Sequence, residues 1–223
     1  MSPSASNHAF VIAVDGPAAS GKGTLARRLA THFGYAHLDT GLIYRAVGLA
    51  LIRQKKAAAD PASALHAAQT LTPDALDDPE LRGDHVAGMA SQVAAMPDVR
   101  TALIDYQRKF ARHPPGGKKG VVLDGRDIGT VICPNADAKL FVDASVETRA
   151  ERRVKELRER GVEAIYARVL QDMKERDTRD RSRSVAPLVP AEDAHTLDTT
   201  DLDADGAFRK ALDFITSRNM SGA

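Results

Sequence analysis

The sequence predicts an α/β protein with three layers, α/β/α, around a mostly five-stranded parallel sheet. Short β-branched runs alternate with amphipathic, helix-like runs, which is typical of a parallel sheet covered on both faces. The first such run, residues 10–14, is followed by a glycine-bracketed loop, residues 16–24, and then by a helix-like run that ends before Gly34. We therefore expect one compact core with a ligand site at the carboxyl edge of the sheet.

The loop after the first strand matches the P-loop pattern G-x-x-x-x-G-K. In such a loop, backbone N–H groups and a helix N-terminus point at an anion, and the lysine reaches the terminal phosphates. Gly23 departs from the common form, because a Ser or Thr that holds Mg²⁺ usually stands there, and here the hydroxyl follows at Thr24. A glycine turn that binds nothing is the alternative, and the flanking strand and helix disfavour it. The residues expected to cradle the phosphates are Gly16, Pro17, Ala18, Ala19, Ser20, Gly21, Lys22, Gly23 and Thr24.

The remaining elements are predicted from periodicity and capping residues. Further strands are expected at residues 35–39, 120–124, 139–143 and 196–198. Thr40, Asp60 and Ser145 are expected to cap helices, and Pro61 fits the first helical position. Other helices are expected from about Asp84, after Pro97, over 164–183 and near the C-terminus, whereas 72–83 has turn chemistry and no strand alternation.

The composition favours small-molecule partners. Lys and Arg number 31 against 30 Asp and Glu, so the chain has no excess charge with which to coat nucleic acid or a membrane. The single cysteine, Cys133, excludes an internal disulfide and fits a reducing compartment. Residues 1–8 lack the apolar core of a signal peptide, and no apolar run has the length of a membrane span. We expect a cytoplasmic monomer with no nucleic-acid or membrane partner.

Several charged residues fit phosphoryl transfer between two phosphates. That reaction requires two polyanions to be held in line and neutralised by a metal, a lysine and arginines. Lys22 lies in the loop, and Asp124, at the end of a buried strand, is a candidate Mg²⁺ partner. Each arginine alone is more simply explained as a solvated helix residue. The candidate phosphate ligands are Arg45, Arg100, Arg126, Arg153, Arg176 and Arg183.

The chain resembles bacterial cytidylate kinases, a family of P-loop nucleoside monophosphate kinases, from about Phe10 to Thr200. The motifs that carry the resemblance are Gly21-Lys22-Gly23-Thr24, Leu38-Asp39-Thr40-Gly41 with Tyr44-Arg45, Ala90-Ser91-Gln92-Val93-Ala94-Ala95, Asp124-Gly125-Arg126-Asp127-Ile128-Gly129-Thr130, and Glu175-Arg176-Asp177 through Asp180-Arg181-Ser182-Arg183 to Ala186-Pro187-Leu188.

The resemblance implies transfer of the γ-phosphoryl group of ATP to CMP or dCMP, with Mg²⁺ as cofactor. It implies catalytic roles for Lys22, Asp124, Arg126 and Arg183, and a magnesium ion held partly through water by Thr24 and Asp124. Residues 16–24 would bind ATP, and Arg152 and Arg153 would add contacts to it. The residues implied to bind CMP are Thr40, Arg45, Ser91, Arg100, Asp127, Arg176, Asp180 and Arg183, of which Ser91, Arg100 and Asp127 would read the base.

The resemblance also implies a division of the chain. A core would comprise residues 9–45 and 97–218, and residues 46–96 would form a monophosphate-binding insert. Family members commonly carry a small antiparallel sheet in this insert, but the short segment here shows no strand alternation, so we predict a helical insert. Residues 149–183 would form a helical lid within the core span that closes over ATP and excludes water.

Three alternatives share parts of this pattern. A kinase for UMP or AMP would handle phosphates in the same way and differ at the base-reading residues. A switch-type or non-catalytic nucleotide-binding protein is disfavoured, because the chain has no Asn-Lys-x-Asp element to read guanine. An RNA-binding surface on 149–183 is disfavoured by the acidic residues interleaved there.

Overall fold

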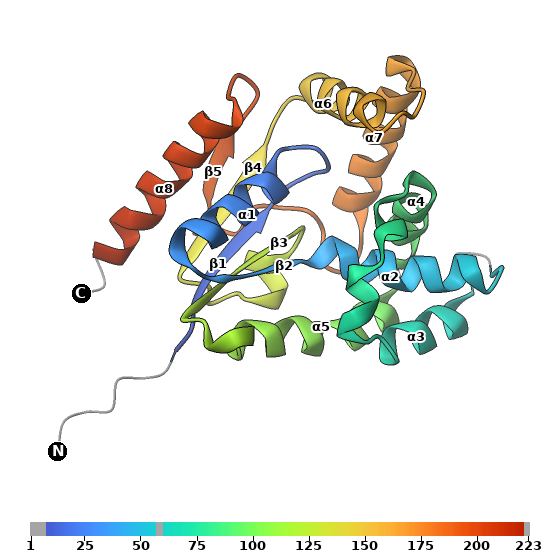
Figure 1. Ribbon diagram of the computed structural model, residues 1–223, viewed down its shortest axis with the longest axis horizontal. Coiled ribbons are helices and arrows are strands. Elements are labelled where there is room, and N and C mark those ends of the chain that lie inside the picture. Colours follow the sequence, from blue (N-terminus) through green and yellow to red (C-terminus); the bar gives the residue numbers. More distant parts are fainter. Residues whose placement is uncertain (1–7, 57–59, 221–223) are drawn as a thin grey trace.

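The computed structural model describes residues 8–56 and 60–220, and its centre is a parallel sheet (Figure 1). The strand order is β2-β3-β1-β4-β5, and every pair of neighbouring strands is parallel. The parallel five-stranded sheet of the sequence prediction is thus confirmed. The strands are β1 (Phe10–Asp15), β2 (Ala36–Asp39), β3 (Gly120–Gly125), β4 (Ala138–Asp143) and β5 (His195–Asp198).

Helices follow most strands and begin close to the predicted caps. Asp60 and Ser145 cap their helices by accepting hydrogen bonds from the backbone N–H groups of Ser63 and Thr148, as predicted. The helices are α1 (Lys22–Phe33), α2 (Thr40–Arg53), α3 (Pro61–Gln69), α4 (Asp84–Val93), α5 (Pro97–Arg112), α6 (Val146–Glu159), α7 (Tyr166–Ser182) and α8 (Ala204–Met220).

One local prediction was wrong. Thr40 does not cap α2: Asp39 does, because its carboxylate accepts from the N–H of Gly41, and Thr40 is the first helical residue. Both residue types cap helices, and pattern alone did not separate neighbours. Residues 72–83, where turn chemistry and no strand were expected, contain two short 3₁₀ helices, Pro73–Asp77 and Pro79–Arg82, which satisfy backbone groups locally.

The core has two apolar layers, one on each face of the sheet. On one face, Ile12 and Val14 of β1 pack with residues of α1 and α8. On the other face, Val11 and Ala13 pack with residues of α2 and α5. This alternation along β1 follows from the period of two in a strand and confirms the three-layer arrangement.

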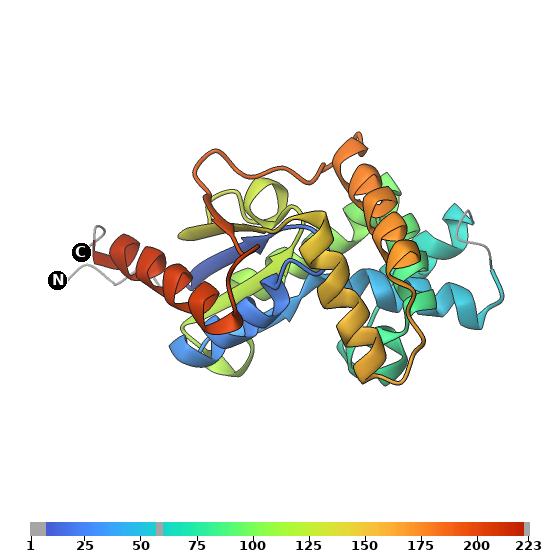
Figure 2. The ribbon, with the colours of Figure 1, turned by 90° about the horizontal axis from the view of Figure 1, so that it is seen from above.

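The helices at the carboxyl edge of the sheet form two groups (Figures 1 and 2). The hairpin of α6 and α7 turns at Gly161, whose φ of +74° suits glycine. Beside it lie α2, α3 and α4, and the described part of residues 46–96 contains helices and turns but no strand. The groups meet where the Arg160 guanidinium, near the hairpin turn, donates to the carbonyl of Arg82 at 2.8 Å.

Candidate active site

The P-loop is held by a close backbone approach at its first residue. A Cβ added to Gly16, whose φ is +150°, would lie 2.0 Å from the carbonyl oxygen of Val142 in β4. Only glycine fits there. At the other end, Gly21 precedes α1 with φ +88° and supplies no side-chain cap to the helix. The first N–H groups of α1 are therefore directed toward the loop without a side-chain partner, which is the arrangement that attracts phosphate.

Lys22 lies in this loop and folds back onto it. Its ammonium group donates to the carbonyl of Pro17 at 3.2 Å. Burial, and after it the positive charge of Arg126, lowers the pKa of Lys22 to about 7, while the nearby carboxylates of Asp124 and Asp39 oppose the shift. A polyanion bound in the loop would favour the charged form of this lysine.

Asp39 and Asp124 stand side by side where β2 and β3 end. They are register partners in the sheet. The Asp124 carboxylate lies 2.7 Å from Nε2 of His37, and its backbone carbonyl accepts from the Thr40 hydroxyl at 2.8 Å. Burial and the charge of Asp124 raise the pKa of Asp39. A Cβ at Gly23 would be 3.7 Å from Oδ1 of Asp124, so the carboxylate faces the P-loop across a small gap.

A pocket beside the P-loop collects residues from five helices and from the end of β3. It contains most of the predicted acceptor residues. Among its described lining residues, six are cationic and four are acidic, so the pocket has a formal excess of two positive charges, compared with +1 for the whole chain. The charged and hydroxyl residues that line it are Lys22, Asp39, Thr40, Tyr44, Arg45, Ser91, Arg100, Asp124, Arg126, Asp127, Arg176, Asp180 and Arg183.

Arg100 and Asp127 form a buried ion pair at one end of this pocket. The Arg100 guanidinium, only 2 % exposed, donates to the Asp127 carboxylate and to the carbonyl of Ala94. Nearby, the buried hydroxyl of Ser91 has no hydrogen-bond partner among the described residues. A buried polar atom without a partner is costly, so this end of the pocket suits a polar ligand.

Three further arginines, Arg126, Arg176 and Arg183, surround Asp180. Arg126 donates to the Asp180 carboxylate at 2.9 Å, and Arg183 lies 3.2 Å from its other oxygen. Burial and neighbouring cations lower the pKa of Arg176 to about 10, and its buried Nε has no partner among the described residues. Arg45 donates to the carbonyl of Leu81 at 2.7 Å. This crowding of cations around one carboxylate is unfavourable unless an anion binds.

The remaining predicted residues lie outside the pocket, on the P-loop side. Thr24 is exposed at the start of α1 and accepts from Arg27 at 3.4 Å. Arg152 donates to the carbonyl of Thr199 at 2.6 Å and approaches that of Ser20 at 3.5 Å. Arg153 pairs with Glu156 one turn along α6. Arg152 thus contacts the P-loop backbone at Ser20.

Comparisons with known proteins decide the family. The family model described as cytidylate kinase matches residues 12–217. The chain belongs to the cytidylate kinase family. A cytidylate kinase of Paramagnetospirillum magneticum is 64 % identical over 93 % of this chain and 98 % of its own. One from Methylocella silvestris is 56 % identical over 95 % and 96 %.

Solved structures agree with this fold at low sequence identity. An uncharacterized protein from Eubacterium ventriosum superposes with a TM-score of 0.54 over 93 % of this chain and 99 % of its own, at 17 % identity. A sugar kinase from Janibacter superposes with a TM-score of 0.50 at 15 % identity, covering 93 % of this chain and 95 % of its own.

Sequence reasoning missed two polar groups near the site. His37, the partner of Asp124, could have been found from strand alternation, which places it on the same face as Asp39. Asp15, at the end of β1, accepts from the backbone N–H groups of Ile128 and Gly129 at 2.8 and 2.7 Å, and burial raises its pKa to about 7. Asp15 therefore fixes the turn directly after Asp127.

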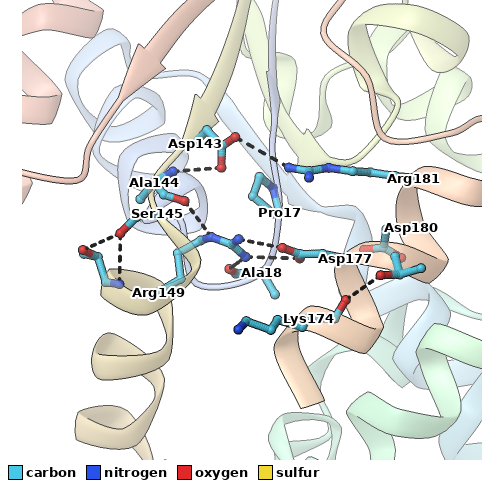
Figure 3. Close-up of polar contacts among 12 residues, drawn as sticks. Pro17, Ala18, Asp143, Ala144, Ser145, Arg149, Lys174, Asp177, Asp180 and Arg181 are labelled. Carbon is cyan, nitrogen blue, oxygen red and sulfur yellow. Dashed lines mark hydrogen bonds and ion pairs between the residues drawn. The ribbon is translucent and has the colours of Figure 1, made fainter. Parts of the chain in front are cut away.

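A third missed feature lies at the base of the α6–α7 hairpin (Figure 3). Arg149 forms a bidentate pair with Asp177, with nitrogen–oxygen distances of 3.1 and 2.6 Å. Arginines on a charged helix are usually solvated, and no local pattern links two residues 28 positions apart.

Proposed function

We propose that the protein transfers the γ-phosphoryl group of ATP to CMP or dCMP and releases ADP and CDP or dCDP. The observation that carries the proposal is the pocket in which the Arg100–Asp127 pair and a cluster of arginines lie beside a P-loop lysine. Membership of the cytidylate kinase family supports the same reaction. No described feature favours UMP or AMP as the acceptor.

The base would be read by Ser91, Arg100 and Asp127. A carboxylate accepts a hydrogen bond from the exocyclic amine of cytosine, whereas uracil presents a carbonyl at that position. Arg100 supports this role because it pairs with the Asp127 carboxylate and holds it in place at the buried end of the pocket. The Ser91 hydroxyl would gain the partner that it lacks among the described residues. Uracil would leave the carboxylate facing an acceptor, which is costly in a buried site.

The phosphates would be held by the P-loop and by the arginines. P-loop N–H groups and Lys22 would hold the ATP phosphates, with Arg152 and Arg153 adding contacts. Thr40, Arg45 and Arg126 would hold the acceptor phosphate, and Arg176 and Asp180 the ribose and phosphate. Arg183 would neutralise the charge that passes between the two. No general base is required, because the acceptor oxygen is already anionic, so positioning and neutralisation carry the catalysis.

The residues at the strand ends fit a magnesium ion. The Asp124 carboxylate faces the P-loop. The Thr24 hydroxyl comes two residues after Lys22 in the sequence. The described residues contain no cluster of three or more acidic, histidine or cysteine side chains that could enclose a metal. Mg²⁺ typically uses one or two carboxylates and otherwise binds water and substrate phosphates. Thr24 and Asp124 would hold the ion partly through water, and the ion would neutralise phosphate charge.

The division of the chain supports exclusion of water during transfer. Residues 9–45 and 97–218 would act as the core, 46–96 as the acceptor-binding insert and 149–183 as the lid. The contact of Arg160 with the carbonyl of Arg82 supports lid closure against the insert. Closure would limit hydrolysis of ATP. We also propose that the protein acts as a monomer in the cytoplasm. No described helix is both long enough and apolar enough to span a membrane.

A coupled ATP-consumption assay with CMP, dCMP, UMP and AMP tests this proposal. We expect CMP and dCMP to give the highest kcat/KM values, and ATP consumption without an acceptor to be slow. Equal rates with and without a nucleoside monophosphate would rule out the kinase. A preference for UMP or AMP would retain phosphoryl transfer and overturn the assignment of Ser91, Arg100 and Asp127.

A further inference from the structure

Arg149 joins four parts of the molecule through one buried guanidinium (Figure 3). It lies in the first turn of α6 and is 2 % exposed. Its Nε donates to the carbonyl of Ala144, directly after β4, at 2.9 Å. Its two terminal nitrogens pair with both oxygens of Asp177 in α7, and one of them reaches the carbonyl of Ala18 in the P-loop at 3.4 Å.

The Ala18 contact is on the carbonyl side of the P-loop. Phosphates bind the N–H side of such a loop. Arg149 can therefore support the loop without occupying the place of a phosphate. The pair with Asp177 also occupies both terminal nitrogens of the guanidinium, so this arginine has little remaining capacity to bind a nucleotide directly.

Asp177 lies within the part of α7 that lines the acceptor pocket. Arg176 is its neighbour, and Asp180 follows one turn later, with Arg183 directly after the helix. All three line the pocket, whereas Asp177 pairs with Arg149 of α6. A rigid pair at Asp177 thus determines where the three acceptor-side residues stand relative to the donor loop.

We propose that Arg149 and Asp177 are positioning residues that hold the acceptor side of α7 in register with the P-loop. This inference rests on the proposed phosphoryl transfer. In-line transfer depends on placement of the donor and acceptor phosphates, and displacements of about 1 Å remote from the reacting atoms can cost about 100-fold in rate. Loss of the pair should therefore reduce turnover more than it weakens binding of ATP alone.

The experiment compares wild type with Asp177→Asn, Arg149→Lys and the double variant. The control is Glu159→Gln, which neutralises a carboxylate that lies 65 % exposed in a 4.0 Å pair with Lys155 on the same hairpin. For each protein, kcat with CMP, KM for CMP and the thermal midpoint are measured, together with the Kd of ATP by calorimetry without CMP. Rates are measured at a temperature at which every variant is folded.

We expect each single variant to lower kcat about 10- to 100-fold and to change the Kd of ATP less than about threefold, because the residues position the reacting groups. The double variant should be no slower than the slower single variant, since both changes break one pair. Glu159→Gln should retain kcat within about twofold. If Asp177→Asn fails to fold, the kinetics of Arg149→Lys test the positioning role, because this variant retains the opposite charges but cannot form the bidentate pair.

A lowered thermal midpoint with kcat near the wild-type value would show a purely structural role and overturn the inference. Losses that multiply in the double variant would show that the residues act separately, which also overturns it. Failure of the proposed function gives a different result: wild-type protein would then phosphorylate none of the four monophosphates. If wild type prefers UMP or AMP, the same comparison is made with that nucleotide.

Discussion

The donor and acceptor halves of the site are built in different ways. The donor half is one continuous loop, residues 16–24, whose main resource is backbone N–H groups at the start of α1. The acceptor half is a set of side chains from α2, α4, α5, α7 and the end of β3. A backbone cradle recognises what all nucleoside triphosphates share, whereas specificity for one base requires side chains. The change of a single residue should thus alter rate in the donor half and preference in the acceptor half.

Lys22→Ala tests the donor half with the largest expected effect. We expect kcat/KM to fall about 1000-fold, which is typical of removing a preorganised charge at a transition state. The fold should persist, because the ammonium makes one long hydrogen bond to Pro17 and its lowered pKa shows that burial opposes its charge. Steady-state kinetics and the thermal midpoint measure both. Near-normal turnover would remove the loop lysine from the mechanism.

Asp127→Asn tests the acceptor half. We expect the preference for CMP over UMP to fall about 10- to 100-fold, because an amide can donate to the carbonyl of uracil. The thermal midpoint should also fall, since the change leaves the buried Arg100 charge without its counterion. The ratio of kcat/KM for CMP and UMP measures the first effect. Asp105→Asn, on the exposed side of α5, serves as the control, and an unchanged ratio at position 127 would contradict the base assignment.

The pH dependence of ATP binding is a further test of the donor half. The pKa of Lys22 is about 7 without a nucleotide, so this lysine loses its proton as the pH rises through 7. Above that pH, ATP must bind with uptake of up to about one proton, and kcat/KM for ATP should decline. Calorimetry in buffers of different ionisation enthalpy counts the protons. Lys22→Arg should abolish the uptake, because arginine stays charged. Equal uptake in both proteins would assign the proton to another group.

Gly23→Ala should have the smallest effect. A Cβ at this position would meet Oδ1 of Asp124 at 3.7 Å and the Arg27 guanidinium at 3.8 Å, which are ordinary contacts. We expect kcat to change less than about threefold, since backbone recognition is retained. Gly16→Ala is the same substitution at the other end of the loop. Its Cβ would lie 2.0 Å from the Val142 carbonyl oxygen, so we expect loss of stable folding. Similar thermal midpoints for the two variants would contradict the close approach at Gly16.

The features that could be predicted from the sequence are local ones, as in the donor half, whereas contacts between distant side chains could not be predicted. The P-loop, the Asp60 cap and the Ser145 cap are local patterns, and each lies where it was predicted. The pair of Asp124 with His37 joins residues 87 positions apart, so strand alternation places His37 on a face of the sheet but does not specify its partner. The Thr40 cap was wrong because two adjacent residues offer similar oxygens. Periodicity identifies elements, whereas buried side-chain pairs depend on how those elements pack.

The excess of two positive charges in the acceptor pocket has a kinetic consequence. A nucleoside monophosphate carries about two negative charges at neutral pH, so the pocket field should speed its diffusional encounter with a nearly neutral protein. Exposed charges are screened within about 10 Å at 0.1 M salt, so the association rate should fall as ionic strength rises. The diphosphate product carries more negative charge than the substrate. The same field that captures the substrate should therefore retard release of the product, which makes product departure a candidate for the slow step of turnover.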